Sequence, residues 1–155
     1  MKKRHQKVKF RLVELTPRED FFDASAMEKH LLEGEGGTAL KYSLHVDYQL
    51  HPDRNIVIIL TAYRIEDKQG RLLAHMSIEN VYRVDEMDKA VSSKDPNSFK
   101  SDSFLYVLID TSISHLRGIQ GLRMKGLQNI PFIPSLASEH MIRAYKEKQQ
   151  AKSEG

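Results

Sequence analysis

Hydrophobic and polar residues alternate without interruption from Leu40 to His51. The even-numbered positions from Leu40 to Leu50 are apolar or aromatic, and the odd-numbered positions from Lys41 to His51 are polar. Because successive side chains of a β-strand point to opposite faces, this pattern predicts a strand with one buried and one solvated side. A sheet with one solvated face is typical of antiparallel architecture. The apolar face of such a sheet then needs a cover from elsewhere in the chain.

A first strand is predicted at Val8 to Leu15, where charged and apolar residues also alternate. Its solvated side carries Lys7, Lys9 and Arg11. Thr16-Pro17 is expected to end this strand. The long connection that follows, residues 17–38, contains a short predicted helix at 24–32 and closes in a glycine-rich turn at 34–37.

Two more strands follow the alternating segment. Residues 56–65 are apolar at both parities, which predicts a strand in the interior of the sheet. Residues 72–84 place apolar groups on one face, with Asn80 as the exception. Turn-forming residues at 51–55 and 67–70 join these strands, so strands two to four are predicted to form an antiparallel meander. Residues 85–102 are polar and are expected to form a loop.

The segment after Ser101 supplies the cover for the sheet. Apolar residues recur at helical spacing from about Phe104 to Met124, and Ser101, Asp102 or Ser103 can cap the first turn. The apolar stripe is unusually wide, and a helix of this kind is usually covered on two sides. The sheet is one cover and a second subunit is the natural other. We therefore expect an oligomer interface that includes Leu105, Ile109, Ser112, Leu116, Gly118 and Ile119.

A second helix is predicted at residues 136–150, after an apolar connector that contains Pro131-Phe132-Ile133-Pro134. The predicted fold class is α+β, a four-stranded antiparallel meander sheet with two C-terminal helices packed on one face. The length is consistent with a single domain over residues 1–155. The basic residues 1–6 and the charged residues 146–155 are expected to be flexible tails.

Composition narrows the functional classes. The chain has 24 Lys and Arg against 21 Asp and Glu, a net charge of +3, and no cysteine. Thiol catalysis, thiolate metal sites and disulfides are therefore excluded. No apolar export signal follows the basic start, and the longest uncharged apolar run is too short to span a bilayer. We expect a cytoplasmic protein without membrane association.

The polar face of the alternating strand does not predict catalysis. Ser43, His45 and Asp47 share that face, but alternate residues of a strand lie about 6.5–7 Å apart, beyond hydrogen-bond reach. A metal ion could be considered for His45, Asp47, His51, His75 and Glu79, but no metal-binding spacing occurs, so solvated side chains are the better interpretation. The glycines at 34–37 precede a strand rather than a helix and do not indicate a phosphate loop. No catalytic residue, metal or cofactor is predicted, and nucleic-acid binding is disfavoured because the aromatic residues lie on the core side.

The apolar residues of the two connections leave two interpretations open. Large apolar groups in loops either pack on the core or bind a partner. We single out seven residues as candidates for contact with a polypeptide client: Phe21, Phe22, Leu31, Leu32, Phe132, Ile133 and Met141.

The stretch from Ile113 to Glu139 resembles the SecB family of bacterial protein-export chaperones. The resemblance is carried by Arg117-Gly118 within the long helix and by the proline-bracketed motif Pro131-Phe132-Ile133-Pro134 in the connector. Asp20-Phe21-Phe22-Asp23 is similar to the acidic-aromatic crossover segment of that family. The order of elements also matches, with four strands, a long crossover between the first two, and two helices.

This resemblance implies an ATP-independent chaperone that assembles as a dimer of dimers, a tetramer, and holds unfolded clients in apolar grooves, with a role in protein transport. The chain departs from the family in its basic charge, since the family docks on the SecA motor through an acidic sheet surface. Docking on that motor is therefore not expected, and a dedicated chaperone for one client is an equal alternative to general export. Two further alternatives stay open, a structural or regulatory interaction module and a small-ligand protein with a pocket beneath the second helix.

Overall fold

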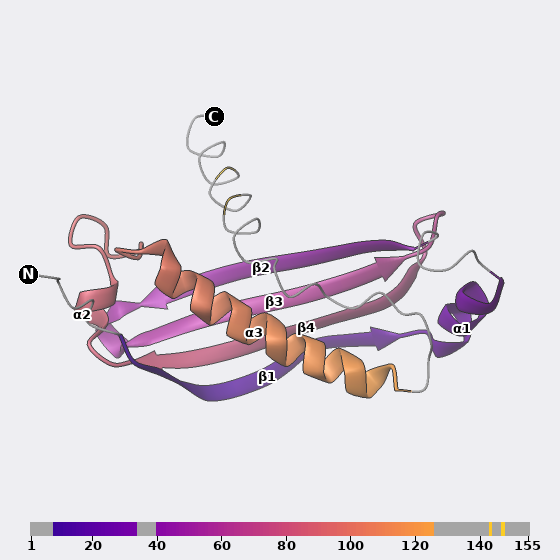
Figure 1. Cartoon of the computed structure of the whole chain (residues 1–155), viewed down its shortest axis with the longest axis horizontal. Coiled ribbons are helices and arrows are strands. Elements are labelled where there is room, and N and C mark those ends of the chain that lie inside the picture. Colours follow the sequence, from indigo (N-terminus) through magenta and orange to yellow (C-terminus); the bar gives the residue numbers. More distant parts are fainter. Residues whose placement is uncertain (1–7, 34–39, 126–142, 144–146, 148–155) are drawn as a thin grey trace, which may run out of the picture.

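The computed structural model describes residues 8–33 and 40–125 of the chain, together with residues 143 and 147. The elements follow the order β1 (Phe10–Phe22), α1 (Ala24–Glu33), β2 (Lys41–His51), the 3-10 turn η2 (Pro52–Arg54), β3 (Ile56–Glu66), β4 (Leu72–Val84), α2 (Met87–Ala90) and α3 (Asp102–Arg123). Figure 1 shows one twisted sheet with α3 lying diagonally across one face, α1 at one end and α2 at the other.

The four strands form a single antiparallel sheet in the order β1-β4-β3-β2. Strands β2, β3 and β4 are consecutive neighbours, which confirms the predicted meander. β3 lies between two other strands, and this confirms the prediction made from its apolar residues at both parities. The α+β class and the antiparallel sheet covered by a helix are therefore confirmed, while the predicted second C-terminal helix lies outside the described residues.

The alternating pattern of β2 matches its two environments. Val46 is 9% exposed, and its apolar neighbours on the same face are half-buried, whereas Lys41, Ser43, His45 and Gln49 are exposed. Two contacts between β4 and α3 identify the covered face, Asn80 to His115 and Tyr82 to Ser112. The described core consists mainly of apolar side chains of β3, β4 and the inner side of α3, and Met27 of α1, Val46 of β2 and Met87 of α2 also belong to it.

The prediction that Thr16-Pro17 ends the first strand is wrong. β1 continues to Phe22 and pairs with β4 along its whole length. Its register with β4 shifts twice, between Leu12 and Glu14 and between Pro17 and Glu19. Proline is tolerated in an edge strand and next to a bulge, because its missing N–H need not serve the ladder there. The two shifts let β1 pass Pro17 and still reach the crossover.

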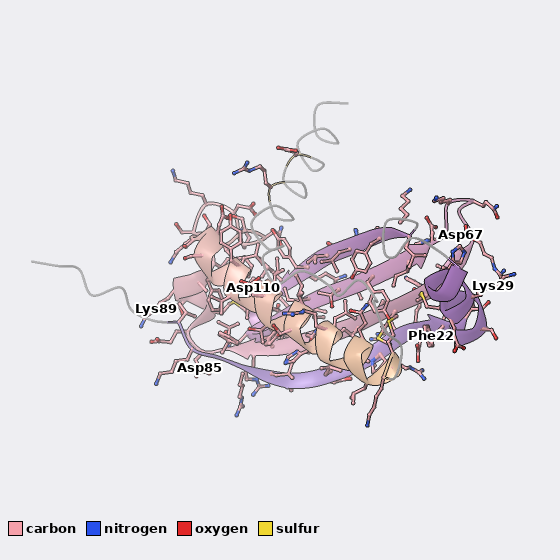
Figure 2. All side chains as sticks on the ribbon, turned by 45° about the vertical axis from the view of Figure 1, so that its right-hand side comes forward. Phe22, Lys29, Asp67, Asp85, Lys89 and Asp110 are labelled. Atoms are coloured by element: carbon pink, nitrogen blue, oxygen red, sulfur yellow. The ribbon has the colours of Figure 1, made fainter. Side chains whose placement is uncertain are left out.

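Helix α1 confirms the short helix predicted at residues 24–32. Asp23 begins it, since its Oδ1 accepts a hydrogen bond from the Ala26 N–H at 2.9 Å, and Met27 is fully buried. The guanidinium of Arg71 lies 2.9 Å from the other oxygen of Asp23 and ties the helix to the β3–β4 turn. In Figure 2, Lys29 and Asp67 mark this end of the molecule, and Asp85 and Lys89 mark the opposite end.

The segment 85–102 is more ordered than the predicted loop. It contains the single-turn helix α2, with Met87 and Ala90 buried, and an isolated bridge between Val91 and Phe99. Backbone hydrogen bonds hold this segment, among them those from the Ser92 N–H to the Ser98 carbonyl and from the Lys100 N–H to the Ala90 carbonyl, each at 2.8 Å. No periodic pattern in the sequence indicates such contacts. Helix α3 begins as predicted, with Ser101 Oγ accepting from the Ser103 N–H at 3.3 Å.

Candidate functional site

The sheet face that points away from α3 is not uniformly polar. β3 carries an aliphatic row on this face, made of the half-buried residues Ile56, Ile58, Leu60 and Ala62. An antiparallel sheet with one solvated face usually alternates apolar and polar side chains, so an aliphatic row on the outer face is an exception to that pattern. The row gives the outer face a continuous apolar strip.

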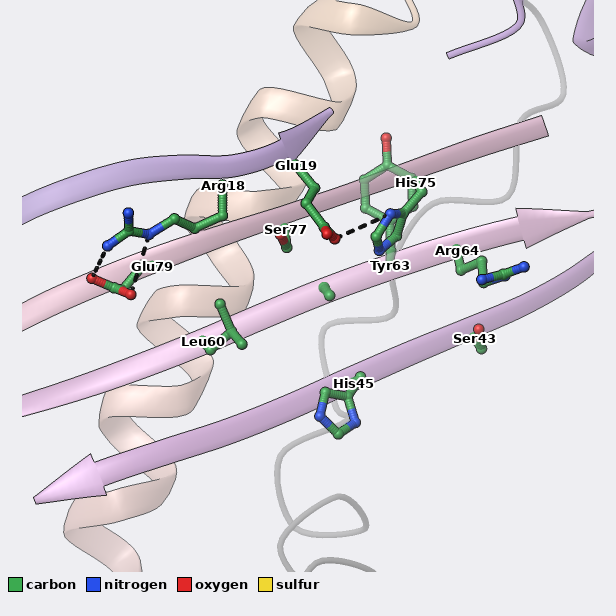
Figure 3. A pocket seen from close by; sticks show the side chains of 11 residues that line it. Arg18, Glu19, Ser43, His45, Leu60, Tyr63, Arg64, His75, Ser77 and Glu79 are labelled. Carbon is green, nitrogen blue, oxygen red and sulfur yellow. Dashed lines mark hydrogen bonds and ion pairs between the residues drawn. The ribbon is translucent and has the colours of Figure 1, made fainter. Parts of the chain in front are cut away.

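An open groove of about 610 Å³ lies across this strip. Its floor includes Leu60 and Ala62, and side chains from all four strands line it (Figure 3). The complete lining comprises Arg18, Glu19, Ser43, His45, Leu60, Ala62, Tyr63, Arg64, His75, Ser77 and Glu79. We define this lining as the outer-face groove.

Ion pairs hold the walls of the outer-face groove. Arg18 donates twice to Glu79, from Nη2 to Oε1 at 2.8 Å and from Nε to Oε2 at 3.3 Å. These hydrogen bonds and the charge of Glu79 raise the pKa of Arg18 above its ordinary value. On the other side, His75 Nδ1 lies 3.4 Å from Glu19 Oε2. The dashed lines in Figure 3 mark both pairs.

The formal charges of the lining balance. Arg18 and Arg64 offset Glu19 and Glu79, and the lining also contains two histidines. The groove is therefore a neutral surface with an apolar floor, and it does not offer the acidic patch that would steer a basic partner.

The adjacent aromatic residues Phe21 and Phe22 lie on opposite faces of the sheet. Phe21 is the register partner of His75, which lines the groove, and its side chain is 45% exposed. Phe22 is the partner of Ala74 and packs half-buried against the core. Of the two, Phe21 is thus placed beside the groove, while Phe22 contributes to the packing under α3.

The other five predicted client residues are not brought to this site by the described part of the chain. Leu31 and Leu32 lie in α1, and the structure describes only the backbone of these two residues. Phe132, Ile133 and Met141 lie outside the described residues. Their contact with a client stays a prediction.

The predicted oligomer interface divides into two groups. Leu105, Ile109, Ser112 and Leu116 are at most 2% exposed because they face the sheet of the same chain. Gly118 and Ile119 remain accessible, and a Cβ built on Gly118 would meet nothing within 4 Å. Val107 and Leu122 on the same helix are 48% and 77% exposed. A partner on α3 would therefore contact the accessible group and not the first four residues.

The polar residues that we considered for catalysis share the outer face. Ser43 and His45 line the groove, as do His75 and Glu79. Glu79 is engaged by Arg18, and Asp47 accepts a hydrogen bond from the Tyr48 N–H at 2.8 Å. Within the described ranges no three His, Asp or Glu side chains gather in a way that could hold a metal ion.

Sequence reasoning missed the outer-face groove although it singled out four of its polar members, Ser43, His45, His75 and Glu79. The aliphatic residues at even positions of β3 were assigned only to burial between neighbouring strands. The combination that indicates a groove is an interior strand with apolar residues on the outer face, flanked by strands that are polar on that face. The cross-strand neighbours, such as Phe21 beside His75, depend on a register that single-strand patterns do not contain.

No protein family model and no curated protein matches this sequence. Among solved structures, the chain is similar to the SecB-like chaperone of Mycobacterium tuberculosis in complex with a ChAD peptide from the HigA1 antitoxin, at 11% sequence identity and a TM-score of 0.39. The match covers 83% of this chain and 90% of that chain. In the part of the chain that the structure describes, no helix is long and apolar enough to cross a membrane.

Proposed function

We propose that this protein is an ATP-independent, SecB-like chaperone that holds unfolded polypeptide segments. The observation that carries the proposal is the apolar strip on the outer face, where Leu60 and Ala62 form the floor of an open groove beside the exposed ring of Phe21. Exposed apolar surface with a polar rim is typical of sites for other polypeptides. The sequence motifs shared with the SecB family point to the same function.

An unfolded client fits the chemistry of the groove. Burial of a client's apolar side chain against the floor contributes about 25 cal/mol per Å² of apolar surface. Such a contact is weak for one residue and is not selective for sequence. The ion-paired walls leave no strong charge to select one client over another. Several weak contacts on one chain, repeated over an oligomer, would supply avidity. Leu31, Leu32, Phe132, Ile133 and Met141 are proposed as further contacts, and the balanced charge of the groove argues against docking on a SecA-type motor.

The test measures aggregation of a reduced, unfolded client by light scattering, with and without this protein. We expect suppression at a small molar excess, with no change when ATP is added. Phe21→Ser is expected to weaken the suppression. Val13→Ser is the matched control, because Val13 lies on the same strand and is 54% exposed. Phe21 lies opposite His75, which lines the groove, whereas Tyr82 and Val81, opposite the two neighbours of Val13, do not line it.

Absence of suppression at several-fold excess by a folded protein would contradict the chaperone proposal and favour an interaction module. Equal losses of suppression in the Phe21→Ser and Val13→Ser proteins would be compatible with chaperone activity. They would show, however, that the outer-face groove is not the site of that activity. Both variants change exposed side chains, so their unfolding midpoints should stay close to that of the unmodified protein.

A further inference from the structure

Two exposed arginines lie directly opposite each other on the outer face of the sheet. Arg11 of β1 is the register partner of Arg83 of β4, and residues directly opposite in an antiparallel pair share a face. Arg83 has the same parity in β4 as His75 and Glu79, which line the outer-face groove, so both arginines lie on the face away from α3. Both side chains are exposed. We define Arg11 and Arg83 as the arginine pair.

The arginine pair lies in contact with no carboxylate. Like charges directly opposite one another destabilise a strand pair, and no ion pair within the described ranges involves Arg11 or Arg83. Other arginines do lie beside a carboxylate, in the pairs Arg18 with Glu79, Arg64 with Glu66, Arg71 with Asp23 and Arg123 with Asp20. An arrangement that costs stability and has no compensating contact within the chain is typical of a functional surface.

The acidic residues at this end of the sheet do not neutralise the arginine pair. Asp85 follows β4, and its N–H donates to the Lys9 carbonyl at 2.9 Å, so the charges of Asp85 and Lys9 offset each other. In the turn η2, the charges of Asp53 and Arg54 offset each other in the same way. Glu14 lies in the next row of β1 and is exposed. Its single carboxylate is outweighed by the two guanidinium groups, so this end of the outer face is basic.

Apolar side chains adjoin the arginine pair on the outer face. Ile56 of β3 is the register partner of Arg83, and the next row sets Val81 of β4 opposite Ile58 of β3. These three side chains are half-buried. None of them lines the outer-face groove, and neither does Arg11 or Arg83. This end of the face is therefore a surface of its own, in which two cations border an apolar patch.

An acidic polypeptide segment fits this surface better than a nucleic acid does. A guanidinium binds a carboxylate through two parallel hydrogen bonds, and the Cβ atoms of directly opposite residues are about 4.5–5.5 Å apart, so both arginines can reach one acidic segment. An aliphatic side chain of the same segment can cover the apolar patch. Single-stranded nucleic acids are usually bound by aromatic side chains on which the bases stack, but the neighbours of the arginine pair on this face are aliphatic.

We infer that this end of the outer face binds an acidic segment of a partner polypeptide. Aspartate or glutamate side chains of the segment pair with Arg11 and Arg83, and an adjacent aliphatic side chain packs on Ile56, Ile58 and Val81. Charges at the rim of an interface act mainly on the rate of association and make binding depend on salt. The inference is independent of the proposed chaperone function, since no residue of the outer-face groove takes part in it.

Fluorescence anisotropy with synthetic peptides tests the inference on the full chain. The probe peptide carries two neighbouring glutamates beside a leucine, and a control peptide carries glutamine in place of both glutamates. We expect the acidic peptide to bind more tightly than the control peptide and to lose affinity at high salt. Equal affinities for the two peptides would overturn the inference, and so would tighter binding of a single-stranded oligonucleotide.

Variants of the protein locate the contact. Arg11→Gln and Arg83→Gln should each weaken binding of the acidic peptide by about threefold, and the double variant by about tenfold, because each exposed charge pair contributes weakly. Lys68→Gln is the matched control, because it removes an exposed cation from the β3–β4 turn at the opposite end of the sheet, and its affinity should stay unchanged. Unchanged affinity in the double variant would overturn the inference. Self-association that both arginine substitutions abolish would assign this surface to a second copy and would overturn it as well.

Unfolding midpoints separate a loss of binding from a loss of folding. Each arginine substitution removes one of two like charges that lie opposite each other, so the midpoint should equal that of the unmodified protein or exceed it. A clearly lower midpoint in both variants would mean that the two arginines stabilise the sheet, and it would overturn the inference.

Discussion

Tyr82 of β4 donates its hydroxyl proton to Ser112 of α3 across 2.8 Å. The direction follows from the second bond of Ser112, whose own proton goes to the Leu108 carbonyl at 2.8 Å. Both side chains are fully buried, so this pair fixes the helix against the sheet at one defined position. A buried polar pair of this kind adds specificity to a contact that is otherwise apolar.

Removal of Ser112 from this pair should cost more stability than removal of the Tyr82 hydroxyl. Tyr82→Phe deletes one hydrogen bond and should lower the free energy of unfolding by about 1 kcal/mol. Ser112→Ala leaves the Tyr82 hydroxyl buried without an acceptor and should cost about 2 kcal/mol. The double variant should lose less than the sum of the two. Urea unfolding of the four proteins provides the measurement, and strictly additive losses would show that the two groups are not coupled.

The neighbouring half-buried histidine, His115, should make stability depend on pH. His115 Nδ1 lies 2.7 Å from Asn80 Oδ1, and burial lowers the pKa of His115 below its ordinary value of 6.5. As pH falls through about 6.5, the unfolded chain binds the proton before the folded chain does. Stability due to this group should therefore be present above that pH and decline below it.

Unfolding midpoints of the unmodified and His115→Gln proteins at pH 7.5 and 5.5 separate this effect from the titration of other groups. The unmodified protein should lose more stability between the two pH values than the variant does. An identical pH dependence in both proteins would assign the effect to other residues.

Phe21 and Phe22 should differ in their contribution to folding. Phe22→Ser removes a ring that packs against the core and should cost about 2 kcal/mol. Phe21→Ser changes an exposed ring and should stay within about 0.5 kcal/mol of the unmodified protein. Thermal unfolding of both variants is the measurement. A large loss of stability for Phe21→Ser would mean that this ring is part of the core and not of the exposed surface beside the groove.

Gly118 should be replaceable by alanine within a single subunit. A Cβ at this position meets no atom within 4 Å, so Gly118→Ala should stabilise α3 by about 1 kcal/mol through the higher helix propensity of alanine. If α3 contacts a second subunit at Gly118, as the sequence predicts, the same change should weaken self-association. Denaturation at low concentration and light scattering at high concentration measure the two effects. Unchanged self-association of the Gly118→Ala protein would show that Gly118 is not part of a subunit interface.

The cap of α1 provides a local test of how the crossover is held. Asp23 accepts from the Ala26 N–H and also pairs with Arg71, so Asp23→Ala should lower the free energy of unfolding by about 1 kcal/mol. Asp23→Asn keeps a capping oxygen and should recover most of this loss. Equal losses in the two variants would place the main contribution in the charge pair with Arg71.

Much of the fold could be predicted from local patterns, because the alternation of apolar and polar residues along a strand matches the alternation of its buried and solvated faces. β4 has the predicted bounds of Leu72 and Val84, and the alternation of β2 coincides with its two faces. The exception at Asn80 is explained by His115, which lies 35 residues later and could not be assigned to it from sequence alone.

The remaining features depend on long-range pairing. β1 continues past Pro17 because it pairs with β4 on both sides of the proline, with two register shifts between the strands. The residues around Pro17 contain no information about β4, which lies far along the chain. The outer-face groove arises only when the register sets Glu19 and His75, or Arg18 and Glu79, side by side. The side chains predicted for the oligomer interface were assigned by spacing alone, which does not reveal how many of them one sheet can already cover.

The pairing of β1 with β4 also has a consequence for the order of folding. Phe10 lies opposite Val84 and Phe22 lies opposite Ala74, so this ladder joins residues 52 to 74 positions apart. The hairpins of β2, β3 and β4 need only short loops to close and can form early, whereas the loop that β1 must close is long and slow to form. During synthesis, the strand that leaves the ribosome first is therefore the last to find its neighbour.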